Sequence, residues 1–192
     1  MKQLVEGLRQ DRLAYARLGN WYGFPGFWLV AIYRFGMWAK RLPHGPRQVA
    51  WLLYRLLHLP YPLFNVVLWA GPGGCDIGPG LCLIHPNNIY FGPGVRIGRN
   101  CLVHHEVTLG MGSVPGTPQL GDNVVLYPGV RVQGGVRIGD NVLVGANCVV
   151  TRHIAPGSVV APAPVRIIPR ALSGAAKAFD RPEAAPPPPQ KD

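Results

Sequence analysis

Two histidines are the residues of this 192-residue sequence whose type and spacing suit chemistry. His85 lies in the stretch LCLIHPNNIYFG (81–92), and His105 lies in VHHEVT (103–108). An imidazole with an ordinary pKa of ~6.5 is mostly neutral at neutral pH, so it can accept a proton from a hydroxyl group. We therefore interpret His85 as a general base, and His105 as a residue that helps to place a small hydroxyl-bearing substrate.

A zinc site is the alternative chemistry for two neighbouring histidines. A catalytic zinc ion takes three protein ligands, so a third ligand would have to come from elsewhere. His104 is expected to point away from His105, and no other suitably spaced histidine pair occurs in the sequence. The residues therefore favour a site without a metal.

The elements that must position these histidines follow from a six-residue repeat over residues 71–155. Each repeat begins with an apolar residue, often followed by glycine, and has a small or branched residue four positions later. Two inward positions and one bend in every six residues predict a triangular parallel β-helix, in which Cys101 and Cys148 fill the core. The apolar first positions are Ile77, Leu83, Phe91, Ile97, Val103, Leu109, Leu120, Leu126, Val132, Ile138, Val144 and Val150.

The repeat also predicts how the two histidines lie. Both are the third residue of their repeat, which is not an inward position, and they are one full coil apart. Because stacked coils are ~4.8 Å apart, the two imidazoles should project from one wall, one above the other.

The spacing of the repeat is broken twice. Leu83 to Phe91 is eight residues instead of six, and Leu109 to Leu120 is eleven, with the insertion GMGSVPGTPQ. A solenoid accommodates insertions where they loop out, and such loops often form the working face. The first insertion follows His85 directly.

The chain is predicted to have three regions. Residues 1–70 show helical spacing in three segments, residues 71–170 form the β-helix, and residues 171–192 form a Pro/Ala-rich disordered tail. The longest uncharged run, 56–75, has the ~20 residues of a membrane span but contains three prolines, so a spanning helix is not expected. Residues 20–70 are aromatic and basic, which fits either a cap packed on protein or peripheral contact with a membrane.

The charge and the cysteines restrict partner and compartment. A net charge of +10 indicates an anionic partner, and in the absence of a nucleic-acid motif a phosphorylated cofactor or an anionic membrane fits better. The four cysteines form no CxxC pair, and no signal-peptide core follows Met1. These features predict reduced thiols in a cytoplasmic protein. They are also compatible with contact between the protein and the inner face of the membrane.

From Ile77 to Ile168 the sequence resembles the hexapeptide-repeat acyltransferases, and most of all the serine O-acetyltransferases. The resemblance is carried by GPGLCLIHPNNIYFGPGVRIG (78–98), VTLG (107–110) and IGDNVLVGANCVVTRHIAPGSVVAPAPVRII (138–168). It implies a left-handed β-helix, a homotrimer or a dimer of trimers, and acetyl-CoA in the groove between subunits. His85 falls on the catalytic histidine of that family.

The resemblance also suggests how the co-substrate binds. Small residues would let the pantetheine arm lie flat against the late coils, and an arginine would suit its phosphates. Backbone N–H groups near Val107–Gly110 would stabilise the oxyanion. The expected cofactor-binding residues are Gly110, Gly145, Ala146, Ala161 and Arg166.

Three departures from the family pattern bear on the acceptor. The family has a second histidine in its extended loop, where this chain has Thr117, which we take as a candidate substrate-binding residue. The family's aspartates, one directly before the catalytic histidine and one fifteen residues before it, are replaced by Ile84 and Ala70. The family's Ala-Gly-x-Pro-Ala is replaced by APAPV (161–165), where an added proline removes a backbone N–H.

These features predict an acetyl-CoA-dependent O-acetyltransferase that acts on serine, as in cysteine biosynthesis. Two alternatives stay open: O-acetylation of a sugar hydroxyl in exopolysaccharide biosynthesis, and an inactive β-helix that serves as a binding or scaffold protein.

Overall fold

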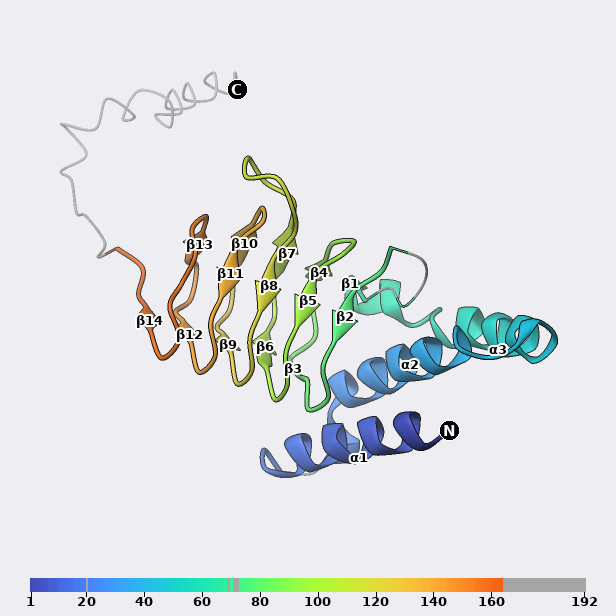
Figure 1. The fold of residues 1–192 in the computed structure, drawn as a ribbon. Helices are drawn as coiled ribbons and strands as arrows, with labels where there is room; N and C mark the ends of the chain where they lie inside the picture. Colours follow the sequence, from blue (N-terminus) through green and yellow to red (C-terminus); the bar gives the residue numbers. More distant parts are fainter. Residues whose placement is uncertain (20, 69, 71–72, 164–192) are drawn as a thin grey trace, which may run out of the picture. The chain divides into compact units, whose positions relative to one another are not determined.

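The computed structural model of the chain describes residues 1–19, 21–68, 70 and 73–163 (Figure 1). Arg166 and the predicted tail, 171–192, lie outside the described residues. Residues 1–162 form one compact unit.

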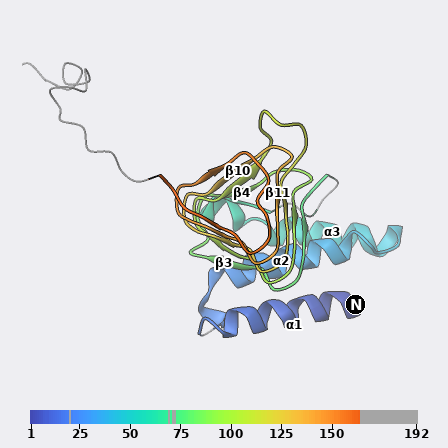
Figure 2. The same cartoon turned by 60° about the vertical axis from the view of Figure 1, so that its left-hand side comes forward.

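The repeat folds as a three-sided parallel β-helix, which confirms the predicted fold class. Sheet A has the strand order β1-β4-β7-β10-β13, sheet B the order β11-β8-β5-β2 and sheet C the order β14-β12-β9-β6-β3. Figure 2 shows the coils nearly end-on. The strands are β1 Val66–Val67, β2 Asp76–Ile77, β3 Cys82–Ile84, β4 Ile89–Phe91, β5 Arg96–Ile97, β6 Leu102–His104, β7 Thr108–Gly110, β8 Gln119–Leu120, β9 Val125–Leu126, β10 Arg131–Gln133, β11 Arg137–Ile138, β12 Leu143–Val144, β13 Val149–Val150 and β14 Val159–Val160.

The register of the strands matches the predicted repeat. Leu83 pairs with Val103, and Val103 pairs with Leu126, so the apolar first positions stack from coil to coil. These residues are at most 6 % exposed and make up the core, together with Cys101 and Cys148. Both insertions lie at corners, outside the core. The pairing of Ile97 with Leu120 is kept across the longer insertion.

The region before the repeat is helical, as predicted, with α1 (Lys2–Ala16), α2 (Pro25–Ala39), α3 (His44–Leu57) and the short 3₁₀ helices η1 (Trp21–Gly23) and η2 (Tyr61–Phe64). Pro25 stands in the first turn of α2, where a missing N–H costs nothing. In the described part of the chain, no helix combines the length and the apolar character that crossing a membrane requires. The β-helix starts earlier than residue 71, because β1 already pairs with β4.

The helices α1 and α2 close the first coil of the β-helix. Strands β2 and β3 are the edges of sheets B and C, so their outer backbone groups need partners from elsewhere. The Leu83 N–H donates to the Tyr15 hydroxyl at 2.7 Å, and the Tyr33 hydroxyl donates to the Cys75 carbonyl at 2.9 Å. Gly26 lets α2 approach β3 closely, since a Cβ there would lie 2.3 Å from the Leu83 carbonyl oxygen.

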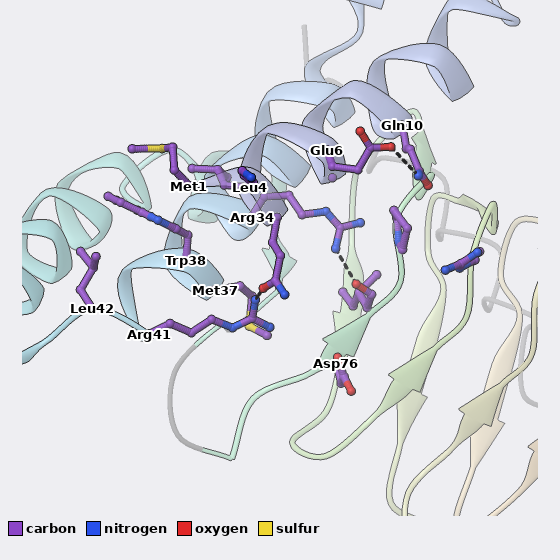
Figure 3. Close-up of a pocket in the computed structure, with 16 residues that line it drawn as sticks. Met1, Leu4, Glu6, Gln10, Arg34, Met37, Trp38, Arg41, Leu42 and Asp76 are labelled. Atoms are coloured by element: carbon purple, nitrogen blue, oxygen red, sulfur yellow. Dashed lines mark hydrogen bonds between the residues drawn. The ribbon is translucent and has the colours of Figure 1, made fainter.

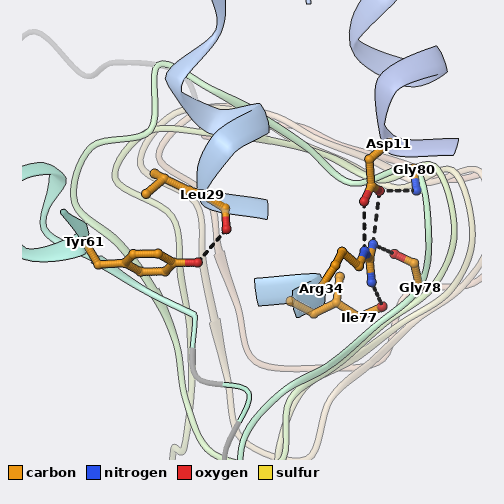
Figure 4. Close-up of polar contacts among 7 residues, drawn as sticks. All are labelled: Asp11, Leu29, Arg34, Tyr61, Ile77, Gly78 and Gly80. Carbon is orange, nitrogen blue, oxygen red and sulfur yellow. Dashed lines mark hydrogen bonds and ion pairs between the residues drawn. The ribbon is translucent and has the colours of Figure 1, made fainter. Parts of the chain in front are cut away.

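A buried ion pair joins the two helices to this coil (Figure 4). Asp11 is fully buried, the Arg34 side chain is 10 % exposed, and Arg34 Nε donates to Asp11 Oδ2 at 2.8 Å. The same guanidinium donates to the carbonyls of Ile77 and Gly78, and Asp11 accepts the Gly80 N–H at 2.7 Å. Every polar partner of the pair is therefore supplied either by the pair itself or by the edge of sheet B and the turn that follows it.

We predict that Asp11→Ala lowers the free energy of unfolding by about 3–5 kcal/mol, because it leaves a buried guanidinium without its carboxylate. Chemical denaturation would measure the change. The matched control is Glu6→Ala, which removes the exposed Glu6–Arg9 pair of the same helix and should barely alter stability. Equal effects of the two substitutions would contradict the role of the buried pair.

Candidate active site

His85 stands at the corner between sheets C and A, directly after β3. Its φ of +50° is a left-handed conformation, which costs a non-glycine residue of order 1 kcal/mol or more. The two extra residues of this corner are accommodated here, and the side chain is exposed. Because β3 is held by Tyr15 and Gly26, the helical cap fixes the strand from which His85 projects.

His105 lies one coil further along the same corner, as the repeat predicts. The pairing of Ile84 with His104 puts His85 and His105 at equivalent positions, with ring centroids 6.4 Å apart and planes at 64°. The two rings are therefore neighbours at a tilt and do not stack flat. Within the described residues, the buried Nδ1 of His105 has no hydrogen-bond partner. A buried polar atom without a partner is unusual and marks its position as a candidate functional one.

Beside the two histidines lies an aromatic pair that the sequence reading did not identify. His104 stacks on Tyr127, with centroids 5.2 Å apart and planes at 10°. Burial lowers the pKa of His104, and the nearby His105 and His85 lower it further. Tyr127 remains 38 % exposed. The signal in the sequence was that Tyr127 follows an apolar first position directly, where the repeat usually has glycine.

Small residues continue this corner towards the last coils. Gly145 and Ala146 follow β12 and Ala161 follows β14, so they lie in the rows that contain Tyr127 and the histidines. The Gly145 N–H donates to the Val160 carbonyl at 2.8 Å, and a Cβ on Gly145 would lie 3.0 Å from that oxygen. The structure thus brings three of the predicted cofactor-binding residues into line with His85.

The other predicted site residues lie elsewhere. Gly110 ends β7, and Thr117 lies in the long insertion before β8, so both belong to the corner between sheets A and B. The Thr117 hydroxyl donates to the Gly94 carbonyl at 2.9 Å. A single chain therefore does not bring Thr117 to His85. Arg166 lies outside the described residues.

One backbone group expected near the chemistry is already used, and the position of one family aspartate is closed to solvent. The Thr108 N–H donates to the Val130 carbonyl at 2.9 Å, so it is used within sheet A and does not face a substrate. Ala70, where the family has its aspartate, is fully buried. The described residues include no group of three or more candidate metal ligands.

A cavity of about 770 Å³ lies away from this corner, between α1, α2 and the first coil (Figure 3). Its lining includes Lys2, Glu6, Arg34, Arg41 and Asp76, and none of the predicted site residues. Arg34 is committed to Asp11, and Arg41 donates to Gln3. The cavity therefore has mixed walls in which Arg34 and Arg41 already have partners, and the chemistry-bearing residues remain those of the histidine corner.

Comparison with known proteins gives a consistent picture. Residues 117–152 match the family described as bacterial transferase hexapeptide (six repeats). The chain is 33 % identical over 150 residues to a serine acetyltransferase of Synechococcus elongatus (76 % of this chain, 57 % of the relative). It is 31 % identical over 156 residues to that of Mycobacterium tuberculosis (75 % and 64 %). The chain thus spans less than two thirds of the length of either relative.

Solved structures of similar fold include two serine acetyltransferases. Isoform 3 from Entamoeba histolytica, in complex with cysteine, superposes with a TM-score of 0.68 at 26 % identity, over 91 % of this chain and 64 % of that one. The soybean apoenzyme superposes with a TM-score of 0.70 at 25 % identity, over 88 % and 70 %.

We predict that Tyr127→Ala raises the pKa of His104 towards its ordinary value, because Tyr127 covers one face of a ring whose pKa is lowered mainly by burial. Titration of the imidazole by nuclear magnetic resonance would measure the change. A pKa lowered in the folded state makes the free energy of unfolding fall as the pH drops below ~6.5, where the unfolded chain takes up the proton first. The substitution should reduce that fall. An unchanged His104 pKa would contradict the covering role of Tyr127.

Proposed function

We propose that this chain, which belongs to the hexapeptide-repeat acyltransferases, is an acetyl-CoA-dependent O-acetyltransferase with His85 as its general base. The observation that carries the proposal is the placement of His85. It stands in a strained conformation at an insertion of the β-helix, with the unpartnered Nδ1 of His105 beneath it. Seven other described non-glycine residues also have a positive φ, but six of them are asparagines and one is a glutamate, so His85 is distinguished by its residue type.

In the proposed reaction, His85 accepts the proton of the acceptor hydroxyl while the oxygen attacks the thioester carbonyl carbon. The carbon–sulfur bond then breaks, the ester forms, and the proton passes from His85 to the departing thiolate of CoA. His105 is suited to help place the acceptor, because its ring is next to that of His85, with centroids 6.4 Å apart. No acidic residue is needed for this proton balance.

The small residues of the corner support the proposed binding of acetyl-CoA. Gly145, Ala146 and Ala161 leave a low surface along which a pantetheine arm could reach His85. Arg166 is proposed to meet the phosphates, since a guanidinium suits phosphate geometry. Gly110, at the other corner of sheet A, would then contact the co-substrate from a neighbouring chain.

A homotrimer, or a dimer of trimers, is part of the proposal. Thr117 and Gly110 lie at a different corner from His85, so one chain does not complete the predicted site. A neighbouring chain could present its own corner between sheets A and B to His85. A solution mass by light scattering equal to that of one 20.9 kDa chain would contradict this assembly.

Serine is the acceptor that we propose first, which would give the protein a place in cysteine biosynthesis. A sugar hydroxyl, as in exopolysaccharide synthesis, is the second candidate. It is favoured by the half-exposed Tyr127 stacked on His104, since an aromatic face can pack against the apolar face of a sugar ring. A non-catalytic scaffold is the third candidate, favoured by the alanine at position 70. We place the activity in the cytoplasm, where the four buried thiols would stay reduced.

We predict that His85→Ala lowers the turnover number by about 10²–10⁴-fold, because the hydroxyl proton then has no acceptor. The release of free CoA thiol from acetyl-CoA would measure turnover, and the affinity for acetyl-CoA should hardly change.

The matched control for this experiment is His44→Ala, which removes another exposed histidine and should leave turnover unchanged. His105→Ala should have a smaller effect, expressed mainly in the acceptor KM. Full activity of His85→Ala would eliminate the proposed base. Absence of thiol release from the parent with every acceptor would favour the scaffold.

The choice between acceptors is tested by the same assay with serine and with a panel of sugars. If a sugar is the acceptor, Tyr127→Ala should raise its KM about tenfold while turnover at saturation changes little, because packing on the ring supplies ground-state binding. If serine is the acceptor, the parent should turn serine over and reject the sugars. A parent that uses serine and loses nothing in Tyr127→Ala would contradict the sugar candidate.

A further inference from the structure

The outer face of α3 is apolar and uncovered. Only Ala50 and Tyr54 of this helix are buried, and it packs on α2. Five aliphatic residues at helical spacing share one exposed face and are 40–72 % exposed: Val49, Leu52, Leu53, Leu56 and Leu57. Two further leucines after the end of the helix, Leu59 and Leu63, are 69 % and 84 % exposed. Contiguous exposed aliphatics of this kind mark an interaction surface.

The charge around this face has one sign. No aspartate or glutamate occurs between Arg12 and Cys75, whereas this stretch contains six lysines and arginines. Within α3 itself, Arg47 and Arg55 are both exposed. A helix with leucines on one face, flanking arginines and no acid is suited to lie in the plane of an anionic lipid interface.

We propose that α3 docks on an anionic lipid surface, with its leucines in the acyl boundary and Arg47 and Arg55 extended to lipid phosphates. A second copy of the same face is a poorer occupant, because it would bring arginine towards arginine with no acidic residue to pair them. In both views α3 extends away from the sheets, which leaves this face free of the β-helix (Figures 1 and 2). The docking is independent of acetyl transfer, which we propose for the corner between sheets C and A of the β-helix.

The test is co-sedimentation of the whole chain with vesicles. Phosphatidylcholine vesicles that contain phosphatidylglycerol should bind the parent, vesicles of phosphatidylcholine alone should bind it weakly, and added salt should reduce binding. Leu52→Gln with Leu56→Gln should lower the partition coefficient by about tenfold or more, because two apolar contacts with the lipid are lost. The matched control is Leu13→Gln, at an exposed leucine of α1, which should bind as the parent does.

Each further outcome decides the proposal. No binding of the parent to anionic vesicles would overturn it, and so would equal loss in Leu13→Gln and in the α3 double variant. A change in solution mass of the double variant without vesicles would assign the face to contact between copies and overturn lipid docking. Thermal unfolding should be the same in all three proteins, since the substituted residues are exposed. Thiol release from acetyl-CoA, measured without vesicles, tests the proposed enzyme separately.

Discussion

The buried ion pair of Asp11 and Arg34 is the interaction on which the placement of the rest depends. A charge pair out of water is tolerated where its remaining hydrogen-bonding groups are satisfied. Here the carbonyls of Ile77 and Gly78 and the N–H of Gly80 complete the shell. These partners belong to the first coil, so the pair is satisfied only when α1, α2 and the β-helix are together. A leucine in place of each ion would bury as much area but would not demand that register.

The helices α1 and α2 also cover the unpaired edge strand β3 of the β-helix. They thereby position the corner that contains His85 and His105. Every interior strand has a neighbour on both sides, whereas β3 has β6 on one side and the helices on the other. The Tyr15 hydroxyl takes the place of a neighbouring strand there, because it accepts the N–H of Leu83, two residues before His85. Burial raises the pKa of the Tyr15 hydroxyl strongly, so the phenol stays protonated and can serve this backbone. The strained backbone of His85 thus rests on a strand that is anchored from both sides.

Much of the fold and of the histidine corner could be predicted from the sequence, because a regular repeat determines which residues pair from one coil to the next. Once Leu83 and Val103 were in phase, the neighbourhood of His85 and His105 followed, and the register confirms it. The tilt of the two rings could not follow, since a repeat determines which residues are neighbours and does not determine side-chain torsions. The His104–Tyr127 stack could not be predicted from either residue alone, because it depends on two residues at the usual glycine position in successive coils. The Asp11–Arg34 pair could not be predicted either. It depends on how α1 packs against α2, and no sequence repeat relates these two helices.

The bond between Tyr15 and Leu83 has a consequence for motion in the molecule. Hydrogen bonds of an interior strand open only when a coil opens, whereas this amide is protected by one side chain on a separate helix. Local opening of a helical cap is a smaller event than unfolding of a solenoid. Separation of α1 from the first coil would release the amide to solvent and free the strand beside His85 while the later coils stay intact. Hydrogen exchange at Leu83 therefore reports the fraction of molecules whose histidine corner is assembled, a quantity distinct from the fraction that is folded.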